Sequence, residues 1–293
     1  MLPEHVQVVV YHDPCKDGLA SACVAFQFNP NIILVPLNHA KKEESAQAVM
    51  QHLGKQIAFF DCVPSSIELL HTLRLHGPVM IQDHHSGNLQ VFKDEEDRTD
   101  LFFDMSKSGC MLAWDYFFPG KERPPLIDLI GERDLGVFNS RNQKIWYALA
   151  EAGVAIDMNL GELNFWILKG QQGVDELVSR GEEISTRIQG QLQALKANVQ
   201  TCTIQKQAYR VCVCEIANYI LISDAAVYFQ RDVYPQVDFV LFYTPNHEGF
   251  RLSFRTAKTE IDLAKIAQSI GGNGHRAAAG AGCETLPWGL LVI

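Results

Sequence analysis

The first half of the chain alternates between short apolar runs rich in β-branched residues and stretches with apolar residues at helical spacing. The runs lie at residues 6–13, 31–39, 56–63 and 78–85, and a fifth is expected at 100–106. Between them, apolar side chains recur about every third or fourth position, as on one face of a helix. Strands that alternate with helices usually pair in parallel. The pattern therefore predicts an α/β domain built on a parallel sheet with flanking helices.

Ionisable residues follow three of these runs. The first run finishes at His12 and Asp13, the third at Asp61, and the fourth at Asp83, His84 and His85. The carboxyl ends of parallel strands meet at one edge of the sheet, where α/β proteins bind ligands. A single carboxylate at such a place is commonly a turn or helix cap, but capping does not explain paired histidines. Carboxylates and imidazoles without thiolate pairs suit Mn²⁺ or Mg²⁺, so we expect one or two such ions here.

Five motifs, in this order along the chain, resemble those of the DHH phosphoesterases. They are HDPCKDG (12–18), FFD ending at Asp61, the Asp83-His84-His85 triplet, GERDLG (131–136) and GGNGHRAAAG (271–280), the last resembling the glycine-rich signature of the DHH-associated domain. The resemblance covers nearly the whole chain. It implies a catalytic domain at residues 1–175, a connecting helix at 176–199 and a smaller, mixed α/β substrate-binding domain at 200–293.

The resemblance also implies a metal centre in which Asp61 bridges two ions. Family members of this kind bind one ion with the residues that correspond to Asp17, Asp61, His84 and Asp134. The second ion would rest on His12 and Asp61. Many members carry a carboxylate where this chain has Cys15, whose thiolate is a better ligand for Zn²⁺ than for Mn²⁺. Cys15 is therefore either a ligand of an altered second site or a small packing residue.

Catalytic roles are expected for two residues beside the ligand His84. Asp83 would accept a hydrogen bond from a ligand imidazole and fix its tautomer. The resemblance implies that His85 donates to the substrate phosphate. A helix over residues 107–118 could bind an anion at its N-terminus, although an ordinary core helix fits its composition better. Of the remaining histidines, which we assign to surface or core, His39 is the one that ends a predicted strand.

The glycine-rich motif near the C-terminus is expected to read the substrate. Glycines let backbone N–H groups approach an anion or a base, although such a turn alone is more often a helix C-cap. Arg255 could hold a terminal phosphate through two parallel hydrogen bonds, which Lys could not. The expected substrate-binding residues are His85, Ser253, Arg255, Gly272, Gly274, His275 and Arg276.

The net charge of the chain is -9, which argues against attraction to long nucleic acid. Together with the resemblance, this predicts a metal-dependent phosphodiesterase for short nucleotides, most specifically one that cuts linear dinucleotides to mononucleotides. A cyclic-dinucleotide phosphodiesterase and a single-strand exonuclease are alternatives. An alternative of another class is a nucleotide-binding regulatory protein with impaired catalysis, because Cys15 replaces the usual carboxylate.

The sequence also bears on location. No apolar run approaches the roughly 20 residues of a membrane span. The N-terminus lacks the basic segment of a signal peptide, and the eight cysteines form no C-x-x-C pair. We therefore expect a cytoplasmic protein with reduced thiols and no membrane partner. The oligomeric state stays open, with a homodimer among the alternatives.

Overall fold

The computed structural model describes residues 1–92, 100–137, 139–151, 160–218 and 221–291. The chain divides into two compact units, residues 1–185 and residues 186–293. Among the described residues, no helix has both the length and the apolar character needed to cross a membrane.

In its described residues, the first unit is built on five strands and the helices that connect them. The strands are β1 (Val8–Asp13), β2 (Ile33–Asn38), β3 (Ile57–Phe60), β4 (Val79–Asp83) and β5 (Leu101–Phe103). The first helices are α1 (Lys16–Phe28), α2 (Lys42–Met50), α3 (Ile67–His76), α4 (Ser86–Val91) and α5 (Gly109–Phe117). The later helices are α6 (Pro125–Asp134), α7 (Ser140–Glu151), α8 (Leu160–Leu168) and α9 (Gly170–Ala194).

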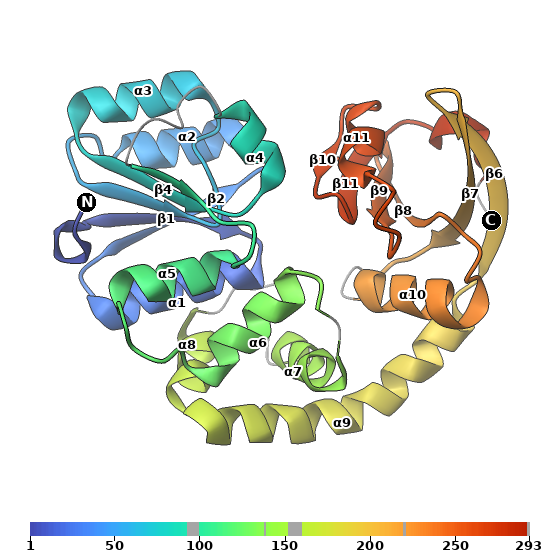
Figure 1. Cartoon of the computed structure of the whole chain (residues 1–293), viewed down its shortest axis with the longest axis horizontal. Helices are drawn as coiled ribbons and strands as arrows, with labels where there is room; N and C mark the ends of the chain where they lie inside the picture. Colours follow the sequence, from blue (N-terminus) through green and yellow to red (C-terminus); the bar gives the residue numbers. More distant parts are fainter. Residues whose placement is uncertain (93–99, 138, 152–159, 219–220, 292–293) are drawn as a thin grey trace. The chain divides into compact units, whose positions relative to one another are not determined.

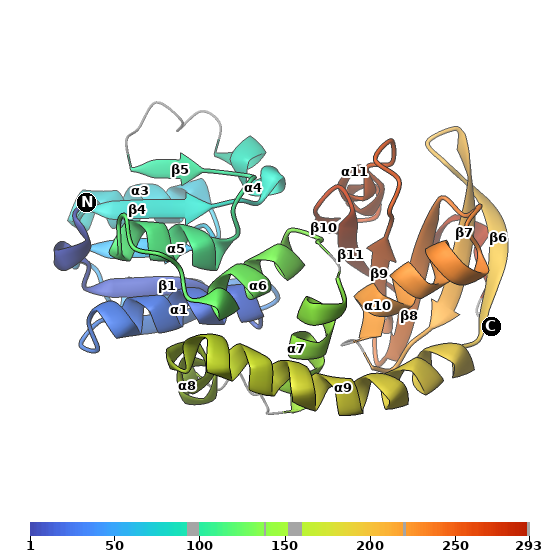
Figure 2. The same ribbon diagram turned by 60° about the horizontal axis from the view of Figure 1, so that its bottom comes forward.

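These five strands form one sheet in the order β2-β1-β3-β4-β5, and every pair is parallel. Helices α1 and α5 lie on one face of the sheet, and α2 and α3 lie on the other (Figure 1). Figure 2 shows β5 at the edge of the sheet. The strand order reverses between β1 and β3, because the chain leaves β1 towards β2 and returns on the far side to β3. That reversal marks the place where α/β sheets bind ligands.

The second unit contains a six-stranded mixed sheet in the order β10-β11-β9-β8-β7-β6. Its strands are β6 (Ala197–Ile204), β7 (Gln207–Glu215), β8 (Phe239–Asn246), β9 (Gly249–Arg255), β10 (Asn273–Gly274) and β11 (Ala278–Cys283). Its helices include α10 (Ile222–Tyr228) and α11 (Leu263–Gln268). Only β7 and β8 pair in parallel among these strands, and the other pairs are antiparallel. The predicted fold class is confirmed in both units.

The helix between the two sheets differs from the predicted connecting helix at 176–199. Helix α9 starts at Gly170, whose positive φ of 58° separates it from α8, and it ends at Ala194. Residues from Ala197 onwards already belong to β6, because they pair with β7 in an antiparallel hairpin. The apolar spacing in the sequence continues the helical pattern beyond Ala194. Nothing in the sequence indicates that a strand begins at Ala197, because its partner β7 lies further along the chain.

Candidate metal centre

Three neighbouring strands bring the predicted ligands to one edge of the first sheet. His12 lies on β1, Asp61 follows β3 directly, and His84 and His85 follow β4. Asp61 has a positive φ of 62°, and its backbone N–H donates to the carbonyl of Gln82 over 3.1 Å. This uncommon backbone conformation turns the carboxylate of Asp61 out of the strand direction and towards the neighbouring strand ends.

Among the residues that the structure describes, three groups of side chains have their ligand atoms within 4.8 Å of one another. The groups are Asp17, His84 and Asp134; His12, Cys15 and Asp61; and Asp61, Asp83, His84 and His85. Nε2 of His84 lies 3.1 Å from Oδ1 of Asp61 and 3.3 Å from Oδ2 of Asp134. Nδ1 of His12 lies 3.3 Å from the other carboxylate oxygen of Asp61, Oδ2. Asp61 therefore presents one oxygen to each of two ligand groups. The six predicted metal ligands, Cys15 included, are brought together.

The charges of the cluster fit a divalent cation. Burial, followed by the nearby Asp17 and Asp61 carboxylates, raises the pKa of Asp134 to about 7. Burial and Asp61 also raise the pKa of Asp17. Burial opposes ionisation of Asp61 as well, but hydrogen bonds with His12 and His84 hold the pKa of this carboxyl well below its ordinary value. Three carboxylates held this close repel one another, and a cation between them removes that repulsion.

The N-terminus of α5 holds Asp17 in place. The carboxylate of Asp17 accepts hydrogen bonds from Oγ of Ser108 (2.7 Å) and from the backbone N–H groups of Gly109 (2.6 Å) and Cys110 (3.1 Å). The anion at this helix end is thus a side chain of the protein, and α5 is otherwise a buried core helix. A Cβ at Gly109 would lie 2.9 Å from Oδ2 of Asp17 and nearer still to Asp61, so this position requires the missing side chain.

Asp83 contacts a different imidazole from the one expected. Its Oδ1 accepts from Nδ1 of His85 over 2.7 Å and meets His84 only through the backbone N–H at 2.8 Å. The ring of His84 is turned towards Asp61, which explains the difference. The other oxygen of Asp83 accepts from the side chain of Asn88 over 2.7 Å. Sequence reasoning missed Asn88, since nothing in the motif marks a residue five positions later.

Two histidines beside the cluster have pKa values shifted in opposite directions. Burial is the largest single effect on the pKa of His85 and lowers it, but the hydrogen bond to Asp83 and the charges of Asp83 and Asp61 together raise the pKa to about 9. Burial, followed by the nearness of His12, lowers the pKa of His39 to about 4. The ring of His39 lies 4.7 Å from that of His12, measured between centroids. At neutral pH His85 holds a proton to donate, whereas His39 is a neutral neighbour of a ligand.

Lys16 and Arg133, which sequence reasoning also missed, lie next to ligands in the chain. Both side chains are buried. Nζ of Lys16 lies 3.8 Å from the ring centroid of Trp146, and Cζ of Arg133 lies 5.6 Å from it. These cation–π contacts fix the segments that carry Cys15 and Asp134 against α7. The position of Lys16 inside the first motif is the one signal that could have indicated it.

The predicted substrate-binding residues of the second unit lie on three adjacent segments, β9, β10 and the turn into β11. Ser253 pairs with Gly280 across β9 and β11. The guanidinium of Arg255 donates to the carbonyl of Phe254 over 2.8 Å, and burial lowers its pKa to about 10. A Cβ at Gly274 would lie 2.5 Å from Cα of Ala279, so this glycine allows β10 to approach β11.

Of the other three predicted residues, Gly272 precedes β10, and His275 and Arg276 lie in the turn from β10 into β11. Gly272 and His275 flank β10, and Arg276 donates from Nε (2.9 Å) and Nη2 (2.6 Å) to the carbonyl of Thr259. The guanidinium of Arg276 also lies 3.7 Å from the carboxylate of Asp262. The structure groups these residues within the second unit, and their role in substrate binding stays a prediction.

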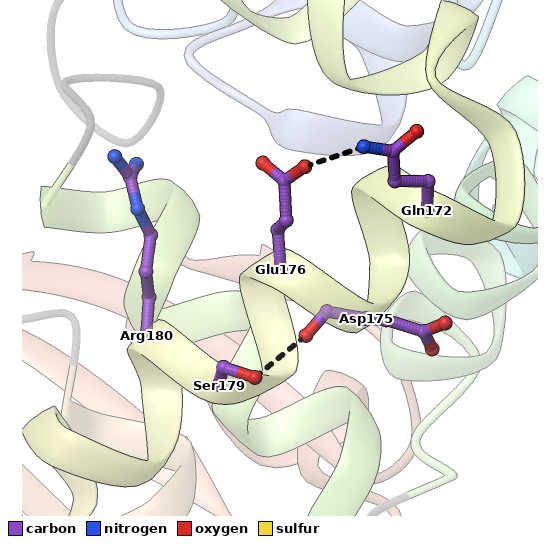
Figure 3. Close-up of a pocket in the computed structure, with 5 residues that line it drawn as sticks. All are labelled: Gln172, Asp175, Glu176, Ser179 and Arg180. Carbon is purple, nitrogen blue, oxygen red and sulfur yellow. Dashed lines mark hydrogen bonds between the residues drawn. The ribbon is translucent and has the colours of Figure 1, made fainter.

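A surface hollow along α9 is separate from the metal centre. It is lined by Gln172, Asp175, Glu176, Ser179 and Arg180, all from this one helix (Figure 3). Gln172 donates to Glu176 over 3.2 Å, and the hydroxyl of Ser179 donates to the backbone carbonyl of Asp175 over 3.0 Å. Other lining residues have partners outside the hollow, since Glu176 accepts from Lys169 and Arg180 lies over the ring of Trp166. None of the lining residues is a predicted metal ligand.

No family model matches the chain. It is 24% identical over 300 residues to the uncharacterized protein R106 of Acanthamoeba polyphaga mimivirus, a similarity that covers 94% of this chain and 67% of R106. Among solved structures, the DHH domain of a member of a family of ribosomal proteins is 14% identical, with a TM-score of 0.50 over 95% of this chain and 83% of that one.

Another solved structure of similar coverage is the pGpG-specific phosphodiesterase PggH of Vibrio cholerae. It is 13% identical and has a TM-score of 0.49 over 94% of this chain and 92% of PggH. At these levels of identity, the likeness to solved structures concerns the fold.

Proposed function

The chain has the fold of the DHH superfamily, and we propose that it is a metal-dependent phosphodiesterase acting on short nucleotides. The most specific form of this proposal is the hydrolysis of linear dinucleotides to mononucleotides. Mn²⁺ is the proposed cofactor, with Mg²⁺ as the substitute, in one or two sites.

The observation that carries the proposal is the position of Asp61 between two ligand groups. One of its oxygens lies 3.1 Å from Nε2 of His84, and the other lies 3.3 Å from Nδ1 of His12. A carboxylate that faces two groups in this way suits two cations a short distance apart, the arrangement used by many phosphoryl-transfer enzymes. Asp17, His84 and Asp134 would hold one ion with Asp61, and His12 with Asp61 would hold the other.

A divalent cation supplies Lewis acidity, which lowers the pKa of water and neutralises charge on the phosphoryl oxygens. The protein side chains would position the substrate and donate hydrogen bonds to it. Burial lowers the pKa of His85, but Asp83 and Asp61 together raise it to about 9 in the metal-free chain. We assign to His85 the donation of a hydrogen bond to a phosphate oxygen. Asp83 and Asn88 orient its ring through the 2.7 Å hydrogen bonds on either carboxylate oxygen of Asp83.

The preference for a short substrate rests on charge. A net charge of -9 provides no general attraction for a polyanion, so a long strand would gain little from the protein surface. Local donors must bind the substrate instead. We propose Ser253, Arg255, Gly272, Gly274, His275 and Arg276 for this role in the second unit.

Hydrolysis assays with matched substrates test the function. A linear diribonucleotide, a cyclic dinucleotide, a longer single strand and bis-p-nitrophenyl phosphate are compared in Mn²⁺, in Mg²⁺ and in chelator. The expected result is Mn²⁺-dependent cleavage with the highest kcat/KM for the linear dinucleotide. Faster cleavage of the cyclic substrate or of the long strand would transfer the proposal to that substrate class.

Two variants separate catalysis from folding. Asp61→Asn removes the charge between the two ligand groups and is expected to abolish hydrolysis. Asp128→Asn is the matched control, because Asp128 lies on α6, faces Arg123 at 3.2 Å and is outside the cluster. Binding of the dinucleotide by the wild type without cleavage in either metal would support a regulatory nucleotide-binding protein. That outcome would refute the proposed enzyme activity.

A further inference from the structure

The two ligand groups that share Asp61 differ in chemistry. The first offers carboxylate oxygens from Asp17 and Asp134 and one imidazole nitrogen from His84. The second offers the imidazole of His12, the thiol of Cys15 and the carboxylate of Asp61. Oxygen-rich sites favour Mn²⁺ and Mg²⁺, whereas thiolate and imidazole favour Zn²⁺. The carboxylate of Asp61 thus faces two sites that prefer different metal ions.

The geometry of the second group suits a zinc ion. Zinc bonds of about 2.0–2.3 Å place tetrahedral ligand atoms roughly 3.5 Å apart. Nδ1 of His12 and Oδ2 of Asp61 already lie 3.3 Å apart, and the sulfur of Cys15 is within 4.8 Å of a ligand atom of each. Three protein ligands with a fourth position open is also the usual composition of a catalytic zinc site.

The location of Cys15 separates it from the packing cysteines of the same unit. Cys23, Cys62 and Cys110 are fully buried, as small apolar residues of a core are. Cys15 is partly exposed instead. It is the N-cap residue of α1, a helix of 13 residues, and its side chain makes no capping hydrogen bond there. The helix N-terminus and a cation bound by His12 and Asp61 would both favour the thiolate form of Cys15.

We propose that the His12–Cys15–Asp61 group selects Zn²⁺, while Asp17, His84 and Asp134 hold Mn²⁺ or Mg²⁺ with Asp61. The centre is then a mixed-metal centre, with the metals distinguished by the thiolate of Cys15. This inference deepens the proposed function and rests on it for the use of the two ions. It also gives Cys15 a positive role, in place of a simple loss of a carboxylate ligand.

Metal content and a thiolate signal test the proposal without an activity assay. The full chain is stripped with chelator, equilibrated with Mn²⁺ in large excess over a low, chelator-buffered concentration of free Zn²⁺, desalted and analysed for bound metal, because Zn²⁺ binds most sites more tightly than Mn²⁺ does at equal concentration. A separate titration with Co²⁺, a spectroscopic substitute for Zn²⁺, monitors the near-ultraviolet thiolate-to-metal charge-transfer band. The wild type is expected to hold about one zinc and about one manganese per chain and to show the band.

Three variants give the comparison. Cys15→Asp is expected to lose the charge-transfer band. Its ratio of bound zinc to bound manganese should fall at least about tenfold in the competition, because manganese takes the place of zinc. Cys15→Ser removes the thiol without adding the charge of a carboxylate, and it is expected to lose the charge-transfer band as well. Cys23→Ala, a core cysteine of the same helix, is the control that keeps both band and zinc. Far-ultraviolet circular dichroism confirms that each variant is folded.

The outcomes separate this inference from the proposed function. A wild type that binds two manganese ions, shows no cobalt–thiolate band and still cleaves dinucleotides would overturn the metal selection alone. A wild type that binds zinc through Cys15 but cleaves no phosphodiester would support the site and overturn the proposed function. A band that survives Cys15→Ser would place the thiolate elsewhere and refute the inference.

Discussion

Gly109 is a position at which the fold leaves no room beside the metal centre. Its backbone N–H donates to Asp17 over 2.6 Å. A Cβ there would lie 2.9 Å from both Oδ2 of Asp17 and Cγ of Asp61. Carbon atoms normally approach no nearer than about 3.5 Å, so Gly109→Ala must displace one or both carboxylates by on the order of 1 Å. Both ligand groups contain one of these carboxylates.

The expected effects on stability and on catalysis differ in size. Overpacking costs about 1–3 kcal/mol, while alanine regains up to about 1 kcal/mol over glycine in a helix. The free energy of unfolding should therefore fall by roughly 0–3 kcal/mol. A displacement of about 1 Å at a catalytic centre costs on the order of 100-fold in rate. We expect Gly109→Ala to fold, and to show a kcat/KM about 100-fold lower with reduced metal content.

Urea unfolding in chelator measures the first effect, and hydrolysis with Mn²⁺ measures the second. Gly190→Ala is the matched control, because a Cβ at Gly190 in α9 would contact nothing within 4 Å. That control should stabilise the protein by about 0.5–1 kcal/mol and leave hydrolysis unchanged. If Gly109→Ala keeps wild-type activity and metal content, the close approach of α5 to the two carboxylates has no functional role.

Three further predictions concern the residues after β4. His84→Ala should lose both bound metal and hydrolysis. His85→Ala should keep bound metal but hydrolyse the substrate slowly. Equal loss of metal from both variants, measured by metal analysis, would contradict the two roles. Asn88→Ala should lower kcat about tenfold and leave the metal content unchanged, because Asn88 orients Asp83 and holds no metal. An unchanged kcat would show that Asn88 does not have this role. In chelator, protonated His85 stabilises the folded state because its pKa is about 9 there and about 6.5 in the unfolded chain. This contribution is roughly 3 kcal/mol at most. It is fully present below about pH 6.5 and disappears as the pH rises through about 9. Unfolding measured from about pH 6 to about pH 10 should show this loss in the wild type and a flatter profile in His85→Gln.

Much of the first unit follows from the sequence because its signals are local. Each apolar run is long enough to define a strand, and the alternation with helices implies parallel pairing. Once the strands are parallel, the residues that end them must share an edge, and this is why His12, Asp61 and His84 could be placed together. The resemblance added Asp17 and Asp134, which no strand end indicates.

The contacts that position these ligands could not be predicted, because their partners are distant in sequence. Ser108, which donates to Asp17, is 91 residues away. The stacking of Lys16 on Trp146 and the contact of His39 with a ligand ring likewise depend on how the elements pack. A side-chain contact of this kind leaves no periodicity in the sequence. The same holds for β6, whose pairing with β7 overrides the helical pattern that precedes it.

Asp17 connects the metal centre to the core of the first unit. Its carboxylate satisfies the N-terminus of α5 and also lies 3.9 Å from Nε2 of His84 in the cluster. The helix end favours the charged form of Asp17, whereas burial and Asp61 disfavour it, as the raised pKa of Asp17 shows. A cation in the cluster acts in the same sense as the helix end, so metal binding and the packing of α5 stabilise the same ionised carboxylate. The ligand is thereby ordered by the fold before any cation is bound, which lowers the entropy lost on binding.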